Sequence, residues 1–129
     1  MAQVTFSNPS GVHRPAARYS QAALIEGGAR RLIISGQIGV LPDGTVLEAP
    51  EEQVRQALHN LVAVLAAHGM RPENVVKVTV LLTDRALLPV WRAERDVAFG
   101  EHAPCSTLMI VAGLADPRFV LEVEAEALG

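Results

Sequence analysis

Aromatic side chains and cysteine are scarce in this 129-residue chain. Only 4% of the residues are aromatic although 50% are hydrophobic, so the core must be built mainly from Val, Leu, Ile and Ala. The single cysteine excludes an internal disulfide and is typical of a reducing compartment. No histidine lies at a recognisable partner spacing from it, so Cys105 is interpreted as an inert thiol. The four histidines form no metal-spaced pair, which argues against a zinc site (His13, His59, His68 and His102).

Basic residues do not outnumber acidic ones, and long apolar runs are absent. The chain has 11 Lys and Arg against 14 Asp and Glu, a formal net charge of -3. Nucleic-acid binding through general electrostatics needs a basic face, so this balance argues against it. No run approaches the about 20 apolar residues of a membrane span, and the N-terminal sequence does not resemble a signal peptide. We therefore expect a soluble, cytoplasmic protein with a single domain over residues 1–129.

Two apolar segments joined by a short turn stand near the C-terminus. The segment 106–112 is nearly all apolar, which predicts a strand covered on both faces. The segment 119–126 alternates, so that one face carries apolar side chains and the other carries Glu122, Glu124 and Glu126. These carboxylates cost little if their face is solvated, but need donors or raised pKa values if it is covered. The environment of that face therefore decides whether a site lies there.

The rest of the chain alternates between strand and helix patterns. A helix is expected to begin at Pro50, with an apolar stripe on one face, and to end before Gly69. Gly36 and Gly39 indicate a bulge or a close backbone approach. The order β, β, β, α, β, α, β, β predicts an α+β fold, a mixed sheet with two helices packed on one face. The other expected elements are strands at 4–7, 19–26, 31–35 and 74–83 and a helix at 87–99.

Several short motifs stand in a fixed order along the chain. They are Asn8-Pro9, Tyr19-Ser20-Gln21-Ala22, Ser35-Gly36-Gln37-Ile38-Gly39, Gln56-Ala57-Leu58-His59-Asn60-Leu61, Val75-Val76-Lys77-Val78-Thr79-Val80, and Pro104 with Glu122-Val123-Glu124-Ala125. Together they resemble the Rid (reactive intermediate deaminase, YjgF-like) family. The resemblance implies a chorismate-mutase-like fold and a homotrimer whose sheets form a central β-barrel, with small-molecule clefts between subunits. The residue pattern independently favours association with further copies of the chain. The two helices can cover only one face of the apolar sheet, and the other face would otherwise be exposed to water.

The family's best-understood members hydrolyse imines and enamines released by pyridoxal-phosphate enzymes, with no metal or cofactor. The resemblance implies the same chemistry here. Those members carry an arginine in a Pro-Ala-Arg-Ser segment, where its guanidinium holds the substrate carboxylate bidentately. In this chain Pro104 is followed by Cys105, Ser106 and Thr107, so Ser106 stands at the arginine position. A hydroxyl does not replace the two-pronged guanidinium group of arginine, so we expect an altered choice of substrate. The same replacement assigns the chain to a subgroup of the family that lacks this arginine.

Other positions of the family's site are retained. The resemblance implies that Glu122 handles the attacking water and that Tyr19 binds the ligand in the cleft. Ser35 and Gly36 match the segment beside the pocket, and Leu108 supplies a backbone position near the substrate. Glu122 and Tyr19 can also be explained without a functional role. Glu122 would equally suit the solvated face of a strand, and Tyr19 would equally suit ordinary packing of a strand.

Further candidates concern the polar groups that would hold the ligand. Ser106 and Thr107 offer hydroxyls at the start of a strand, a position where such residues often have no functional role. Arg14 and Arg18 precede Tyr19 in a loop, and either is a candidate to replace the missing cation. Arg92 is a third candidate, and the asparagine usually found near it in the family is missing.

Three classes of function follow. The first is a cofactor-independent hydrolase or deaminase of imine-like metabolites, with Glu122 and Tyr19 as its catalytic pair. The alternative is a non-catalytic, metabolite-binding or regulatory trimer, which the Ser106 replacement favours. An endoribonuclease, the label attached to some relatives, has less support because the chain is acidic and poor in aromatic residues.

Overall fold

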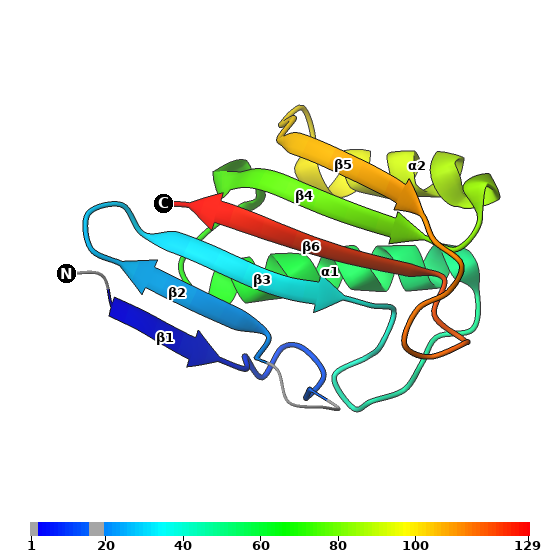
Figure 1. Cartoon of the computed structure of the whole chain (residues 1–129), viewed down its shortest axis with the longest axis horizontal. Coiled ribbons are helices and arrows are strands. Elements are labelled where there is room, and N and C mark those ends of the chain that lie inside the picture. The colour runs from blue at the N-terminus through cyan, green and yellow to red at the C-terminus, as the bar shows by residue number, and fades with distance from the viewer. Residues whose placement is uncertain (1–2, 16–19) are drawn as a thin grey trace.

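The computed structural model describes residues 3–15 and 20–129, which form one six-stranded mixed sheet with two α-helices on one side (Figure 1). The strand order is β1-β2-β3-β6-β4-β5, and only the β4–β5 pair is parallel. The predicted element order and the predicted α+β architecture are confirmed. The elements are β1 (Gln3–Ser7), β2 (Ala22–Glu26), β3 (Arg31–Gln37), α1 (Pro50–Ala67), β4 (Val75–Leu82), α2 (Leu88–Phe99), β5 (Cys105–Ile110) and β6 (Leu121–Leu128), with short 3₁₀ turns at Pro72–Asn74 and Arg85–Leu87.

Helix α1 begins and ends where the sequence predicted. Pro50 occupies the first turn, where its missing N–H is not needed, and two glutamates there oppose the positive end of the helix dipole. Gly69 follows the last turn with a φ of 68°, a left-handed conformation that glycine adopts without strain. The helix therefore has a fixed start and stop.

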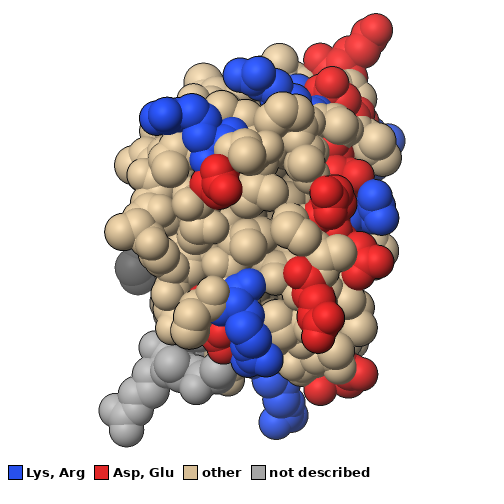
Figure 2. All heavy atoms as spheres, turned by 90° about the vertical axis from the view of Figure 1, so that its right-hand side faces the viewer, with Lys and Arg blue, Asp and Glu red and all other residues tan. Residues whose placement is uncertain are grey.

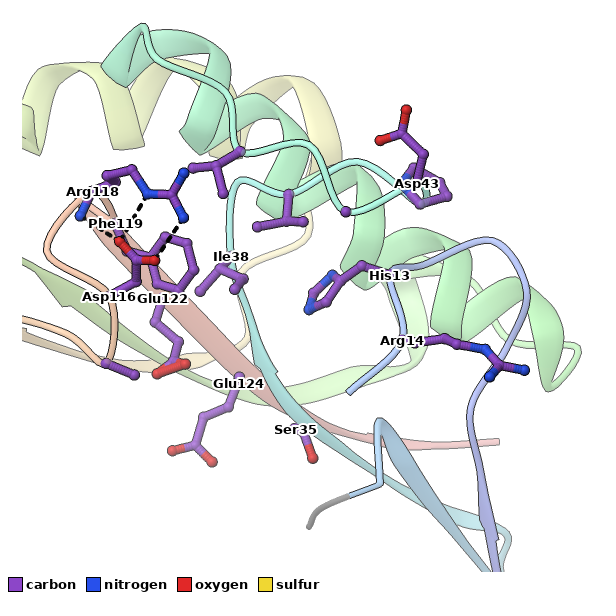
Figure 3. A pocket seen from close by; sticks show the side chains of 16 residues that line it. His13, Arg14, Ser35, Ile38, Asp43, Asp116, Arg118, Phe119, Glu122 and Glu124 are labelled. Atoms are coloured by element: carbon purple, nitrogen blue, oxygen red, sulfur yellow. Dashed lines mark hydrogen bonds and ion pairs between the residues drawn. The ribbon is translucent and has the colours of Figure 1, made fainter. Parts of the chain in front are cut away.

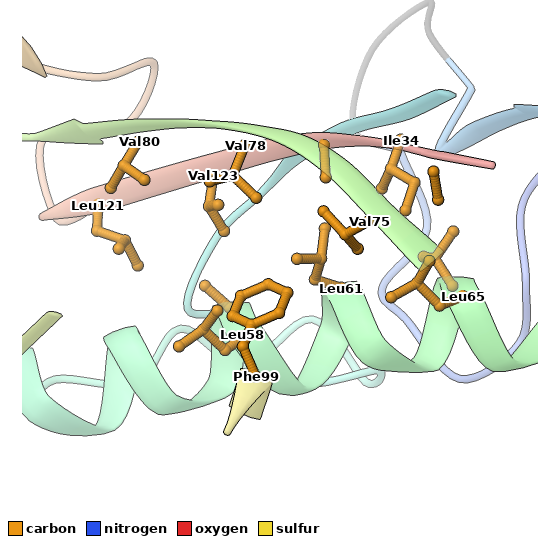
Figure 4. Close-up of a cluster of buried hydrophobic side chains, with 14 of the residues drawn as sticks. Ile34, Leu58, Leu61, Leu65, Val75, Val78, Val80, Phe99, Leu121 and Val123 are labelled. Atoms are coloured by element: carbon orange, nitrogen blue, oxygen red, sulfur yellow. The ribbon is translucent and has the colours of Figure 1, made fainter. Parts of the chain in front are cut away.

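The core lies between α1 and the sheet (Figure 4). Leu58, Leu61 and Leu65 of α1 face the strands, and Leu121 and Val123 of β6 meet them from the other side. This core is aliphatic as expected, and the aromatic side chains that it contains are Trp91 and Phe99 of α2. Burial of these apolar surfaces is the main force that holds the helices on the sheet.

Strand β6 divides its side chains between the two faces of the sheet. Leu121, Val123 and Ala125 are buried against the helices, while Glu122 and Glu124 point to the opposite face. We call this second side, which neither helix covers, the open face. The predicted alternation is confirmed, although the strand begins at Leu121 rather than at residue 119.

Strand β5 departs from its prediction. It ends at Ile110 rather than at residue 112, and it lies at the edge of the sheet. Its residues are exposed apart from the half-buried Leu108, so the expected cover on both faces is wrong for the single chain. The reason is the position of β5 at the edge of the sheet. It has a neighbouring strand on one side only, and α2 does not cover the face of β5 that points away from the helices. Among the described residues, no helix is long and apolar enough to cross a membrane.

Candidate functional site

A cleft with a volume of about 810 Å³ opens beside the ends of β3 and β6 (Figure 3). Ser35 and Gly36 of β3 and Glu122 and Glu124 of β6 form its floor. Its walls are two loops, residues 38–46 and residues 115–119, together with His13 and Arg14 from the N-terminal segment. Segments far apart in the sequence thus meet around one hollow.

Two buried amides of α1 hold the loops that form the walls. The Gln53 side-chain amide donates to the carbonyl oxygens of Leu47 and Arg118, each at 2.8 Å, and its oxygen accepts from the Val120 N–H at 3.0 Å. Asn60 donates to the carbonyl oxygens at positions 38 and 40 at 3.1 and 3.0 Å. Buried hydrogen bonds of this kind fix backbone position, so the helix that carries the core also shapes the cleft.

Gly36 makes room for the carboxyl group of Glu122. The β3–β6 register shifts between Ile34 and Gln37, which confirms the predicted bulge at this glycine. A Cβ atom at Gly36 would lie 2.6 Å from Cδ of Glu122, so any other residue would displace the glutamate. Partial burial raises the pKa of the Glu122 carboxyl, and the nearby charge of Glu124 raises it further. The predicted carboxylate face is therefore only partly solvated at Glu122, and none of the described residues donates a hydrogen bond to this carboxyl group.

Cations and anions both surround the cleft. Arg118 lines it but binds Asp116 bidentately, with Nη2 at 2.8 Å from Oδ2 and Nε at 3.1 Å from Oδ1. Hydrogen bonds from Arg118 lower the pKa of Asp116 to about 2, so this aspartate stays charged. Arg14 lies at the rim of the cleft and is exposed.

In Figure 2, which shows the right-hand end of Figure 1, acidic side chains form a band along one side and basic side chains lie in separate groups.

The structure brings some of the predicted site residues together. Glu122, Ser35, Gly36 and Arg14 all line the cleft. The Ser35 hydroxyl already donates to the carbonyl oxygen of Ser20, so its role there is at least partly structural. Two further predicted residues, Tyr19 and Arg18, lie outside the described residues.

The predicted residues of β5 lie elsewhere. Ser106, Thr107 and Leu108 do not line the cleft of the single chain, because β4 separates β5 from β6. The Thr107 hydroxyl accepts a hydrogen bond of 2.6 Å from the Lys77 ammonium, and the Leu108 side chain packs against the core. Arg92 is on α2 and is also absent from the cleft lining.

Sequence reasoning missed most of the side chains that line the two loops, and among the residues it missed are His13, Arg118 and Phe119. Arg118 and Phe119 precede β6 in a loop whose path depends on Gln53, and no local pattern signals that contact. His13 follows a turn-forming segment and was considered only as a metal ligand. Among the described residues, no group of three or more His, Cys, Asp or Glu side chains is placed to hold a metal ion.

The close approach of Gly36 and Glu122 predicts an energetic coupling between them. Gly36→Ala is expected to lower the free energy of unfolding of the wild-type protein but to have little effect on that of the Glu122→Ala variant. Urea unfolding of the two single variants and the double variant should therefore give a coupling free energy of about 0.5–3 kcal/mol. Gly39→Ala is the control, because its Cβ would lie 2.6 Å from Cα of Gln53. It should destabilise both backgrounds equally, by about 1–3 kcal/mol. Additive effects of Gly36→Ala and Glu122→Ala would contradict the described packing.

Comparison with known proteins identifies the family of the chain. The sequence pattern of the family described as Endoribonuclease L-PSP matches residues 11–128. A RutC family protein of Aquifex aeolicus is 45% identical over 71 residues, which cover 54% of each chain. The human 2-iminobutanoate/2-iminopropanoate deaminase is 46% identical over 68 residues, 51% of this chain and 47% of that protein. The chain thus spans about half the length of these two curated relatives.

Solved structures extend the similarity to nearly the whole chain. The crystal structure of RidA from the Antarctic bacterium Psychrobacter matches with a TM-score of 0.87 at 27% identity, covering 95% of this chain and 98% of that one. The expected chorismate-mutase-like fold is therefore confirmed. The chain belongs to the Endoribonuclease L-PSP family, also called the Rid, RutC or YjgF-like family.

Proposed function

We propose that this protein is a cofactor-independent hydrolase that deaminates small imines or enamines in the cleft beside Glu122. The observation that carries the proposal is the partly buried carboxyl group of Glu122 over Gly36, at the floor of a cleft large enough for a metabolite. Relatives named 2-iminobutanoate/2-iminopropanoate deaminase support the choice of reaction. Tyr19 is retained in the proposal as a ligand-binding residue on the strength of the family resemblance alone.

The reaction requires one water molecule and a base. Ionised Glu122 would accept a proton from water as the oxygen attacks the imine carbon, so that a C–O bond forms and the C=N π-pair moves to nitrogen. Glu122 would then return this proton to nitrogen, which gives a carbinolamine. The hydroxyl proton of the carbinolamine would next pass through Glu122 to the same nitrogen, and the C–N bond would break as the C=O bond forms, so that ammonia and a carbonyl product leave. A raised pKa makes a carboxylate a stronger base, which suits this role near neutral pH.

Substrate choice would differ from that of arginine-bearing relatives. Ser106 stands where those relatives bind a carboxylate, and it offers no charge. The charge of Arg118 is largely engaged by Asp116, whereas Arg14 forms no ion pair with any described residue. We therefore propose that Arg14, at the rim, is the better candidate cation for an anionic substrate. Ser106, Thr107 and Leu108 would contribute to a ligand site only where β5 of a neighbouring subunit approaches the cleft.

We also propose a homotrimer, with the open face at the subunit contact. Ile33, Leu81 and Met109 alternate with residues of the helix-covered side and thus belong to the open face. Met109 is 46% exposed in the single chain. The open face thus combines apolar side chains with the glutamates of β6, and exposed apolar side chains gathered on a sheet are typical of a protein–protein contact. The proposed location of this assembly is the cytoplasm, in line with the single cysteine.

Ser106 favours a second candidate function, a metabolite-binding or regulatory trimer without turnover. A site that lacks its anion clamp can retain affinity for a ligand and yet fail to orient it for attack. The endoribonuclease suggested by the family's description is disfavoured by the net charge of -3 and by the mixed charges in Figure 2.

Substitution of the proposed base tests the hydrolase directly. Glu122→Gln is expected to slow ammonia release from freshly generated 2-iminobutanoate by about a hundredfold or more, because general-base catalysis contributes factors of that order. The wild-type rate should fall as the pH drops through the raised pKa of Glu122, since only the ionised form accepts a proton. The midpoint of this fall in the pH–rate profile should lie above the ordinary glutamate pKa of about 4.3.

Glu126→Gln is the matched control for this experiment. Glu126 lies on the same strand and the same face, but it pairs with Arg31 at 2.9 Å and does not line the cleft. Its substitution should leave ammonia release within about twofold of the wild-type rate, as exposed ion pairs contribute little. Equal rates for Glu122→Gln, the wild type and the buffer alone would instead favour the binding module.

Sedimentation in solution tests the assembly. The wild type is expected to sediment as three chains of 13.8 kDa. Met109→Arg would place a charge in the proposed contact and should yield single chains. Val97→Arg is the control, because Val97 is 81% exposed on α2, away from the open face, and its substitution should leave the trimer intact. A monomeric wild type, or a trimer unaffected by Met109→Arg, would contradict the proposed contact.

A further inference from the structure

His13 is a buried histidine whose ring has no hydrogen-bond partner among the described residues. Its side chain faces the cleft (Figure 3), and only 6% of the residue is exposed. Neither Nδ1 nor Nε2 forms a hydrogen bond with any residue that the structure describes. Buried polar atoms in folded proteins are nearly always hydrogen-bonded, so an orphaned imidazole facing a cleft requires an explanation.

The backbone around this ring is firmly held. The Gln21 side-chain amide donates to the carbonyl oxygen of His13 at 3.0 Å, and the Gln37 amide donates in turn to the Gln21 side-chain oxygen at 2.6 Å. Both glutamines are fully buried, and the preceding Val12 belongs to the core. The carbonyl oxygen of His13 is therefore hydrogen-bonded, while the two buried ring nitrogens have no partner among the described residues. A side chain positioned in this way is preorganised to contact something in the cleft.

The ring offers a hydrogen bond rather than a charge. Burial lowers the pKa of His13, so its imidazole is neutral at pH 7. A neutral imidazole has one N–H donor and one acceptor nitrogen. A neutral donor suits a carbonyl oxygen or an imine nitrogen better than it suits a carboxylate, which is bound more strongly by a cation.

Glu122 lines the same cleft as His13. In Figure 3 the His13 ring and the Glu122 carboxyl group both border this cleft, with Ile38 between them in the view. The proposal requires that one small molecule in the cleft meets both side chains. A donor on one side and a carboxylate on the other are the two groups that a polarised double bond and its attacking water require.

We propose that His13 is a ligand-binding residue of the cleft, whose ring N–H donates a hydrogen bond to the carbonyl oxygen or imine nitrogen of a bound small molecule. The imine as ligand rests on the proposed function, whereas the carbonyl ligand does not require turnover. With an imine, this hydrogen bond would draw electron density from the C=N carbon and favour attack by water.

Binding of 2-oxobutanoate, a carbonyl counterpart of an imino acid, tests the proposal without turnover. Calorimetric titration of the full chain should give a Kd that rises about tenfold in His13→Leu, the factor expected for one lost hydrogen bond. His13→Gln keeps a donor and should recover part of the affinity. The Tm of His13→Leu should equal or exceed that of the wild type, because the change removes an unpaired buried polar group. His59→Leu, on the exposed side of α1, should change neither quantity by much.

A measurement on the wild type guards against a variant that fails to fold. The ring ¹⁵N resonances of His13 should shift when 2-oxobutanoate saturates the protein, while those of His59 should not. Unmoved His13 resonances, an unchanged Kd in His13→Leu, or no binding to the wild type would each overturn the proposal. A lower Tm and a lost assembly with an unchanged Kd would assign the ring to a subunit contact and also overturn it. Binding through His13 without ammonia release from the imine would support it and contradict only the hydrolase.

Discussion

The packing of α1 against β3 and β6 is the contact on which the rest of the structure depends. Its apolar stripe forms one side of the core, and the buried residues of β6 form the other. The same helix carries Gln53 and Asn60, which hold the two loops of the cleft. Because β6 alternates, burial of Leu121 and Val123 against α1 forces Glu122 onto the open face. Core and cleft are therefore two results of one arrangement.

Glu122 illustrates the tension between stability and chemistry that this arrangement produces. Its carboxyl group lies over Gly36, partly out of water and near Glu124. A carboxyl whose folded-state pKa is raised favours the folded protein most when it is protonated, so that stability is lost as the pH rises through the raised value. The charged form needed for proton transfer is thus the less stable one, as is common for groups that act as bases.

The sequence predicted those features that arise from local periodicity. The stripe of α1 and the alternation of β6 depend on residues close together in the chain, and both were confirmed. The exposure of β5 was not predicted, because it depends on strand order, which places β5 at the edge of the sheet. The position of His13 was not predictable either, since Gln21 and Gln37 fix it through hydrogen bonds that leave no spacing pattern. The family resemblance identified Glu122 but gave no indication of its neighbours Arg118 and Phe119.

The central claim is that Glu122 is an ionisable group held partly out of water at the floor of a cleft. Site-specific ¹³C titration of the Glu122 carboxyl carbon by NMR tests it most directly, with Glu126 as an internal reference on the same strand. The account predicts a midpoint for Glu122 clearly above the ordinary glutamate value of about 4.3. A midpoint at or below that value would show a solvated carboxylate and would contradict the claim.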